Sequence, residues 1–111
     1  MRCFKCFLCK NMCRYMGKDD IDMEQLKEMS KQGAVILDVR SPQEYGEGHI
    51  DGAILIPEYE LRVKVNKILK DKNQTIIAYC PSGFRSKRAQ RLLKNMGYQN
   101  VYNLYKGFEN Y

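Results

Sequence analysis

The sequence lacks any apolar run that approaches the roughly 20 residues needed for a membrane-spanning helix. It also lacks the features of a secretory leader, because Lys5, Lys10 and Arg14 interrupt the apolar N-terminus and no small-residue cleavage site follows. These absences predict a cytoplasmic protein without a transmembrane segment. The 111 residues, of which 44% are apolar and 29% charged, suffice for one globular domain with a core but not for two.

Acidic residues are scarce at both ends of the chain, whose formal net charge is +6. Residues 1–18 hold five Lys or Arg and no acid, and residues 80–111 hold six against Glu109 alone. No interleaved aromatic pattern and no known nucleic-acid motif accompanies these charges, so we expect no nucleic-acid partner. A basic rim concentrates anions, which favours a small anionic substrate.

Disulfide bonds are not expected, because the five cysteines are poorly distributed for a disulfide framework. Four of them fall within the first thirteen residues, and the fifth, Cys80, lies far downstream. We therefore divide the chain into a Cys-rich, basic N-terminal extension over residues 1–16 and one reduced, intracellular domain over residues 17–111.

The extension has the C-x2-C-x2-C-x3-C spacing of a bacterial ferredoxin run, at Cys3, Cys6, Cys9 and Cys13. No proline follows the run and no second set of cysteines exists, so a ferredoxin cluster site is incomplete. The four thiols could instead bind zinc or copper(I), accept sulfur from Cys80, or carry acyl chains as a membrane-surface anchor. We favour a flexible extension without bound metal, since terminal segments are commonly disordered.

Downstream of the extension, short apolar runs alternate with helical patterns. Strands are predicted over residues 34–39, 53–56, 75–79 and 101–104. Helices are predicted over residues 23–32, where Asp22 and Gln25 form a capping box, and around residues 61–69 and 89–96. Ser41 and Pro42 predict a break, and residues 46–52 a loop. The alternation predicts an α/β fold with an open, mainly parallel sheet of about four to five strands and helices on both faces.

Cys80 lies where the third of these strands ends and a basic, helix-like segment begins. In an open α/β sheet, ligands bind beyond the carboxyl ends of the strands, and the N–H groups and dipole of a helix N-terminus favour an anion there. A thiolate is such an anion, so we expect Cys80 to be an exposed nucleophile supported by Arg85. Gly83 permits a tight turn, Pro81 removes one N–H donor, and Arg85 can hold an oxyanion at two points. The alternative is a buried strand cysteine without a chemical role.

This part of the sequence resembles the single-domain rhodaneses, the thiosulfate sulfurtransferase-like family, in three motifs that lie in register. The stretch CPSGFR, from Cys80 to Arg85, has the family's loop form Cys-x-x-Gly-x-Arg. LDVR at residues 37–40, EY at 44–45, GHI at 48–50 and GA at 52–53 are similar to its upstream signature. Val101, Leu104 and Gly107 resemble its closing strand and turn, so the resemblance runs from about Ile21 to the C-terminus.

The resemblance implies a sulfurtransferase that needs no cofactor and no metal. Cys80 would attack the outer sulfur of a small anionic donor such as thiosulfate and become a persulfide. The sulfur would then pass to cyanide, a thiol or a partner protein. Arg85 would bind the donor oxyanion, and the loop residues would cradle the persulfide: Pro81, Ser82, Gly83, Phe84 and Ser86. Structural roles are implied for Asp38, Arg40, Glu44 and His49.

The chain departs from the family pattern near its C-terminus, where Lys106 replaces a frequent second glycine and Tyr111 a frequent tryptophan. These differences concern the packing of the last turn more than the chemistry. A non-catalytic binding module and a sulfur carrier remain alternatives, although the presence of both Cys80 and Arg85 favours the enzyme. A cysteine phosphatase is less favoured, because its loop has five residues between cysteine and arginine where this chain has four.

Overall fold

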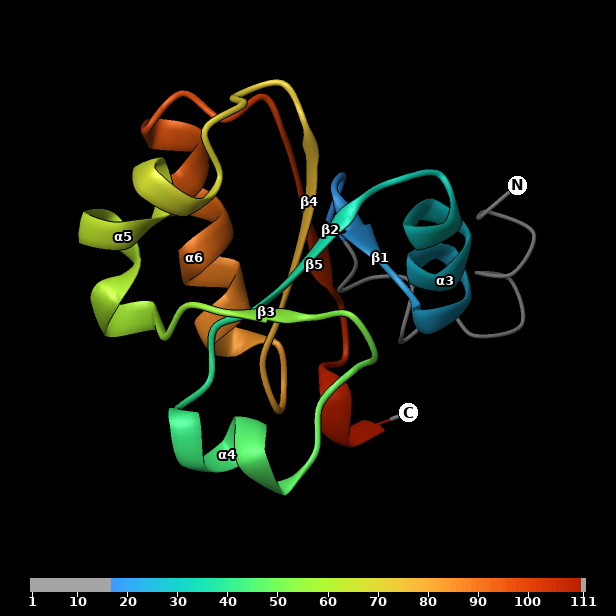
Figure 1. Ribbon diagram of the computed structural model, residues 1–111. Helices are drawn as coiled ribbons and strands as arrows, with labels where there is room; N and C mark the ends of the chain where they lie inside the picture. Colours follow the sequence, from blue (N-terminus) through green and yellow to red (C-terminus); the bar gives the residue numbers. More distant parts are fainter. Residues whose placement is uncertain (1–16, 111) are drawn as a thin grey trace.

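The computed structural model of the chain describes residues 17–110, and the predicted Cys-rich extension lies outside the described residues. Five parallel strands form one open sheet in the order β1-β5-β4-β2-β3 (Figure 1). The strands are β1 (Asp20–Ile21), β2 (Val35–Asp38), β3 (Ile54–Leu55), β4 (Thr75–Tyr79) and β5 (Asn100–Leu104). This sheet confirms the predicted α/β fold, and β4 lies at its centre.

Helices cover both faces of the sheet (Figure 1). One face packs against α3 (Met23–Lys31), and the other against α5 (Leu61–Ile68) and α6 (Phe84–Asn95). Neighbouring residues of one strand enter opposite cores: Ile77 packs with Leu26 of α3, and Ile76 with Leu93 of α6. Because side chains alternate across a strand and both faces are covered, the inner strands β2 and β4 consist almost wholly of apolar residues.

The segment after β2 differs from the sequence prediction, which had a break at Ser41 and Pro42. The chain forms a short helix there, α4 (Pro42–Glu47). Pro42 occupies the first helical turn, where its missing N–H costs nothing, and Ser41 and Glu44 form a capping box. The helix continues into the predicted loop, which begins at Gly48 instead of Gly46. The proline therefore starts a helix rather than a loop.

The other helices lie where they were predicted, although α6 begins at Phe84 rather than near residue 89. Asp22 and Gln25 form the expected capping box, and α3 ends at Lys31 with Gln32 as its C-cap. Short 3-10 turns, η1 (Glu58–Glu60) and η2 (Phe108–Asn110), precede α5 and end the described chain. Between residues 17 and 110, no helix has the length and apolar character needed to cross a membrane.

A buried polar cluster ties the carboxyl ends of β2 and β4 together. Arg40 donates from Nη2 to Asp38 Oδ2 at 2.8 Å and to the Gly48 carbonyl at 2.6 Å. The Tyr79 hydroxyl donates to Asp38 Oδ2 at 2.6 Å and accepts from the Ile50 N–H at 3.0 Å. Burial, reinforced by the hydrogen bond to Asp38, raises the pKa of Tyr79, so the phenol stays protonated. These contacts fix the loop after α4 to the end of the sheet.

Tyr79→Phe should lower the free energy of unfolding by about 1–3 kcal/mol, because it leaves the Ile50 N–H without its acceptor and removes one of the hydrogen bonds to Asp38 Oδ2, which keeps Arg40 as a donor. Urea denaturation at pH 7 measures the change. Tyr102→Phe is the matched control, since the half-buried Tyr102 hydroxyl makes no hydrogen bond within residues 17–110. Equal stability of the two variants would show that the cluster does not hold this edge of the sheet.

Candidate active site

Cys80 follows β4 directly, and its side chain is buried rather than exposed as predicted from the sequence. Only 1% of the residue is accessible, because the following loop curls over the sulfur and α6 packs against it. The Gly83 N–H donates to Sγ at 3.0 Å, and the Ser86 N–H does so at 3.3 Å. The Ser86 hydroxyl lies 3.3 Å from the same sulfur. The protein itself, and not water, therefore surrounds the thiol with polar groups.

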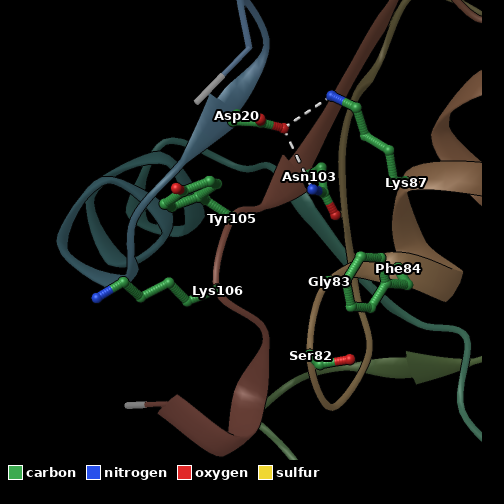
Figure 2. A pocket seen from close by; sticks show the side chains of 8 residues that line it. All are labelled: Asp20, Ser82, Gly83, Phe84, Lys87, Asn103, Tyr105 and Lys106. Atoms are coloured by element: carbon green, nitrogen blue, oxygen red, sulfur yellow. Dashed lines mark hydrogen bonds and ion pairs between the residues drawn. The ribbon is translucent and has the colours of Figure 1, made fainter. Parts of the chain in front are cut away.

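The loop residues predicted to form a cradle divide into two groups. Gly83 and Ser86 are buried, and their N–H groups contact the sulfur. Ser82 is exposed, Phe84 is 74% exposed, and Pro81 is half-buried. Ser82 and Phe84 line a hollow of about 550 Å³ between the loop and the end of β5 (Figure 2). Gly83, which contacts the sulfur through its N–H, also borders this hollow. The remaining lining residues are Asp20, Lys87, Asn103, Tyr105 and Lys106.

The C-terminal turn clamps the loop in its curled form. Gly83 has φ +96°, and a Cβ there would lie 2.6 Å from the Tyr105 carbonyl oxygen. Gly107 has φ +81°, and its Cβ would lie 2.4 Å from the Pro81 carbonyl oxygen. The Phe108 N–H donates to the Cys80 carbonyl at 2.8 Å. Only glycine fits at both positions, so loop and turn require each other.

Arg85 is engaged by a carboxylate, which the sequence analysis did not anticipate. Its Nη1 and Nη2 each lie 3.0 Å from one oxygen of Glu44 in α4. This bidentate pair uses the two-point grip that the sequence suggested for a substrate oxyanion. The hydrogen bond from Arg85 lowers the pKa of Glu44 to about 2, so the carboxylate is ionised at neutral pH. The pair also fastens α4 beside the loop.

A second arginine near the sulfur is paired in the same manner. Arg88 donates to Glu58 of η1 at 2.8 and 3.0 Å. Both Arg85 and Arg88 interact electrostatically with Cys80, although hydrogen bonds to their glutamates are the larger cause of their raised pKa. The positive potential at Cys80 is thus partly balanced by Glu44 and Glu58.

His49 contacts Tyr45 and not the sulfur. Its ring stacks on Tyr45 with centroids 3.7 Å apart, and Nδ1 lies 2.9 Å from the Tyr45 carbonyl oxygen. The side chain is exposed. This arrangement fits the structural role that the resemblance implied, and the sulfur has no histidine base among its contacts in the described part of the chain.

Sequence reasoning missed two residues of the site, Asn103 and Asp20. The Ser86 hydroxyl donates to Asn103 Oδ1 at 2.5 Å, and Asn103 Nδ2 donates to Asp20 Oδ1 at 3.2 Å. A polar residue inside the apolar run 101–104 was a readable signal for Asn103. No pattern marks Asp20, because the two-residue strand β1 is too short to show a periodicity.

The described residues offer no evident metal site. Within residues 17–110, no group of three or more His, Cys, Asp or Glu side chains is placed to hold an ion. The four cysteines discussed as metal ligands lie outside that range.

The fold and the site together define a class: an α/β protein with a cysteine held by backbone donors at the carboxyl edge of a parallel sheet. Residues 22–111 match the family model described as Rhodanese-like domain. The chain therefore belongs to the rhodanese-like family. This confirms the resemblance and its extent from about Ile21.

Named relatives share much of this chain. Thiosulfate sulfurtransferase PspE of Escherichia coli is 40% identical over 67 residues, which are 60% of this chain and 64% of that protein. Thiosulfate sulfurtransferase GlpE of Stutzerimonas stutzeri is 35% identical over 80% of each chain. The structure titled human single-domain sulfurtransferase TSTD1 superposes with a TM-score of 0.72 over 83% of this chain and 93% of its own, at 24% identity. That likeness shows the fold.

Gly83→Ala should destabilise the protein by more than the roughly 1–2 kcal/mol that a left-handed residue costs, because the new Cβ also collides with the Tyr105 carbonyl. Gly52→Ala is the matched control, since Gly52 has φ +82° but no atom lies within 4 Å of its Cβ position. Thermal unfolding of both variants measures the difference. If Gly83→Ala costs no more than Gly52→Ala, the close packing of loop and turn is not a constraint.

Proposed function

We propose that this protein is a sulfurtransferase that carries sulfane sulfur as a persulfide on Cys80. The observation that supports this most is the placement of Cys80 Sγ, which receives two backbone N–H groups at the N-terminus of α6. Such donors and the helix dipole stabilise an anionic sulfur without a neighbouring base. The family membership and the relatives named thiosulfate sulfurtransferase support the same activity.

The transfer divides into two displacement steps at sulfur. The Cys80 thiolate attacks the outer sulfur of the donor, here taken as thiosulfate, and the new S–S bond forms as the donor's S–S bond breaks. Sulfite leaves with the electron pair of the broken bond. A thiophilic acceptor, such as cyanide or a thiol, then attacks the outer sulfur of the persulfide, and Cys80 leaves as a thiolate. Each intermediate is an anion that the loop donors stabilise.

Burial of Cys80 restricts the partners that reach it. With 1% of the residue accessible, a donor must displace part of the loop that covers the sulfur. A small anion meets this requirement better than a bulky substrate, which supports a small anionic sulfur donor. A protein acceptor would have to present its thiol on an extended segment.

Arg85 is proposed to bind the oxyanion of the donor while it remains paired with Glu44. A guanidinium has five N–H donors, and the contacts to Glu44 use only one from each Nη. The remaining N–H groups can donate to an anionic sulfur donor, and the charge of Arg85, which interacts with Cys80, attracts such a donor toward the sulfur. Glu44 then acts as a competitor of the donor for the same guanidinium.

A phosphatase is a poorer fit to this site. Four residues separate Cys80 from Arg85, and the arginine that would grip a phosphate is held by Glu44. A non-catalytic binding role does not use the donors aimed at Sγ. We therefore place sulfur transfer first, with delivery to a thiol or a partner protein as its physiological form.

Cys80→Ser should reduce thiocyanate formation from thiosulfate and cyanide by on the order of 10³-fold or more, because the hydroxyl cannot carry sulfane sulfur. The fold should be unchanged, as judged by circular dichroism and thermal unfolding. Cys9→Ser, which removes a cysteine of the N-terminal run, is the matched control and should retain turnover. Wild-type turnover in Cys80→Ser would refute the proposal.

Arg85→Ala should lower kcat/KM for thiosulfate by about 10- to 100-fold, mainly through a higher KM, because a charge-assisted hydrogen bond to the donor is lost. Glu44→Gln should act in the opposite direction and lower KM, since it releases the guanidinium and still caps α4. Steady-state kinetics at fixed ionic strength measure both. If both variants keep the wild-type KM for thiosulfate, Arg85 does not bind the donor.

A further inference from the structure

A chain of buried polar side chains leads from Cys80 to the edge of the sheet. Ser86 on α6, Asn103 on β5 and Asp20 on β1 are 0%, 3% and 4% exposed. The parallel register of β1 with β5 places Asp20 opposite Asn103. Figure 2 shows the Asp20 carboxylate joined to both Asn103 and Lys87. The proposed chemistry uses Cys80 and the loop but assigns no role to Asn103 and Asp20.

The direction of the hydrogen bonds along these buried side chains is fixed by Asp20. Burial raises the pKa of Asp20, but hydrogen bonds from the Gly17 N–H, Lys87 and Asn103 outweigh it and lower the pKa below its usual value. Asp20 is therefore an ionised carboxylate that only accepts hydrogen bonds. The amide Nδ2 of Asn103 must face it, because the reverse orientation would set the amide oxygen against the carboxylate. Asn103 Oδ1 consequently faces Ser86.

The Ser86 hydroxyl completes the chain at the sulfur. It has one proton, and the short 2.5 Å contact gives that proton to Asn103 Oδ1. Toward Cys80 Sγ, 3.3 Å away, Ser86 then presents an oxygen lone pair. A thiol at Cys80 can donate its S–H to this oxygen. A thiolate cannot, and it would compete with Asn103 for the single hydroxyl proton.

We propose that Asp20 and Asn103 are positioning residues that turn the Ser86 hydroxyl away from Cys80, so that it accepts from the thiol rather than donating to the thiolate. The hydroxyl then gives no hydrogen bond to the anion, whose hydrogen bonds within residues 17–110 come from the N–H groups of Gly83 and Ser86. This inference rests on the proposed function, in which Cys80 is the reacting residue. It adds a control on when the sulfur ionises.

Other charges that face the sulfur do not depend on this chain. Arg85 and Arg88 of α6 interact with Cys80 from the helix that packs on it, and their partners are Glu44 of α4 and Glu58 of η1. Lys87, on the same helix, pairs with Asp20 at 3.0 Å. A change at Asn103 leaves these ion pairs in place, so its effect on Cys80 isolates the hydroxyl.

The test follows the rate of Cys80 alkylation by iodoacetamide against pH in the full chain. Trypsin cleavage after Lys72 and Arg85 releases a peptide in which Cys80 is the only cysteine, so mass spectrometry separates it from the N-terminal thiols. The midpoint of the profile reports ionisation, and the plateau reports access to the buried thiol. Loosening of the fold raises the plateau, so a changed midpoint counts for the proposal only where the plateau is unchanged.

Asn103→Leu should move the midpoint to lower pH by about one unit, a tenfold change in thiolate fraction, since Ser86 becomes free to donate to the sulfur. In a Ser86→Ala background the same substitution should move nothing. Asp20→Asn, which keeps the volume and polarity of the site, is the second variant. Asp20→Asn should also move the midpoint to lower pH. The part of this shift that passes through Asn103 and Ser86 should vanish in a Ser86→Ala background.

An unchanged midpoint in both single variants would overturn the proposal, as would equal shifts with and without the Ser86 hydroxyl. These alkylation measurements need no sulfur donor. A protein without thiosulfate turnover would therefore contradict the proposed function. The alkylation midpoints would still decide whether Asp20 and Asn103 orient the Ser86 hydroxyl.

Discussion

The sulfur of Cys80 is almost wholly removed from water, so the polar groups around it must come from the protein. The N–H groups of Gly83 and Ser86 meet this requirement, but only if the loop curls tightly over the sulfur. Gly83 permits the curl through its positive φ, and Gly107 allows the C-terminal turn to close against Pro81. The geometry of the loop thus depends on a segment more than twenty residues downstream.

The parallel sheet makes this arrangement rigid. Cys80 leaves the central strand β4, whose neighbours β2 and β5 supply Asp38 and Asn103 at the same edge. Asp38 binds Tyr79 immediately before the loop, and Asn103 binds Ser86 immediately after it. The sulfur-binding loop is therefore held at both ends by buried hydrogen bonds. One polar cluster joins β2 to β4, and the other reaches Cys80 Sγ.

Much of the fold was predictable because both faces of the sheet are covered, which leaves largely apolar runs for β2, β4 and, apart from its asparagines, β5. Cys80 and its loop were predictable from one short motif. The helix α4 was missed because Pro42 was interpreted only as a break. Ser41 and Glu44 form the capping box of this helix, and Pro42 occupies its first turn. The burial of Cys80 and the Arg85–Glu44 pair were not readable. Both depend on segments brought together by the fold, and Glu44 lies 41 residues from Arg85.

The central claim is that Cys80 binds sulfane sulfur covalently, and intact-mass spectrometry of the purified protein tests it most directly. After incubation with thiosulfate, we expect a mass gain of one sulfur atom that maps to Cys80, disappears on addition of cyanide, and is absent in Cys80→Ser. A protein that takes up no sulfur, or that takes it up equally well in Cys80→Ser, would contradict the account. The rhodanese-like fold would then serve binding rather than transfer.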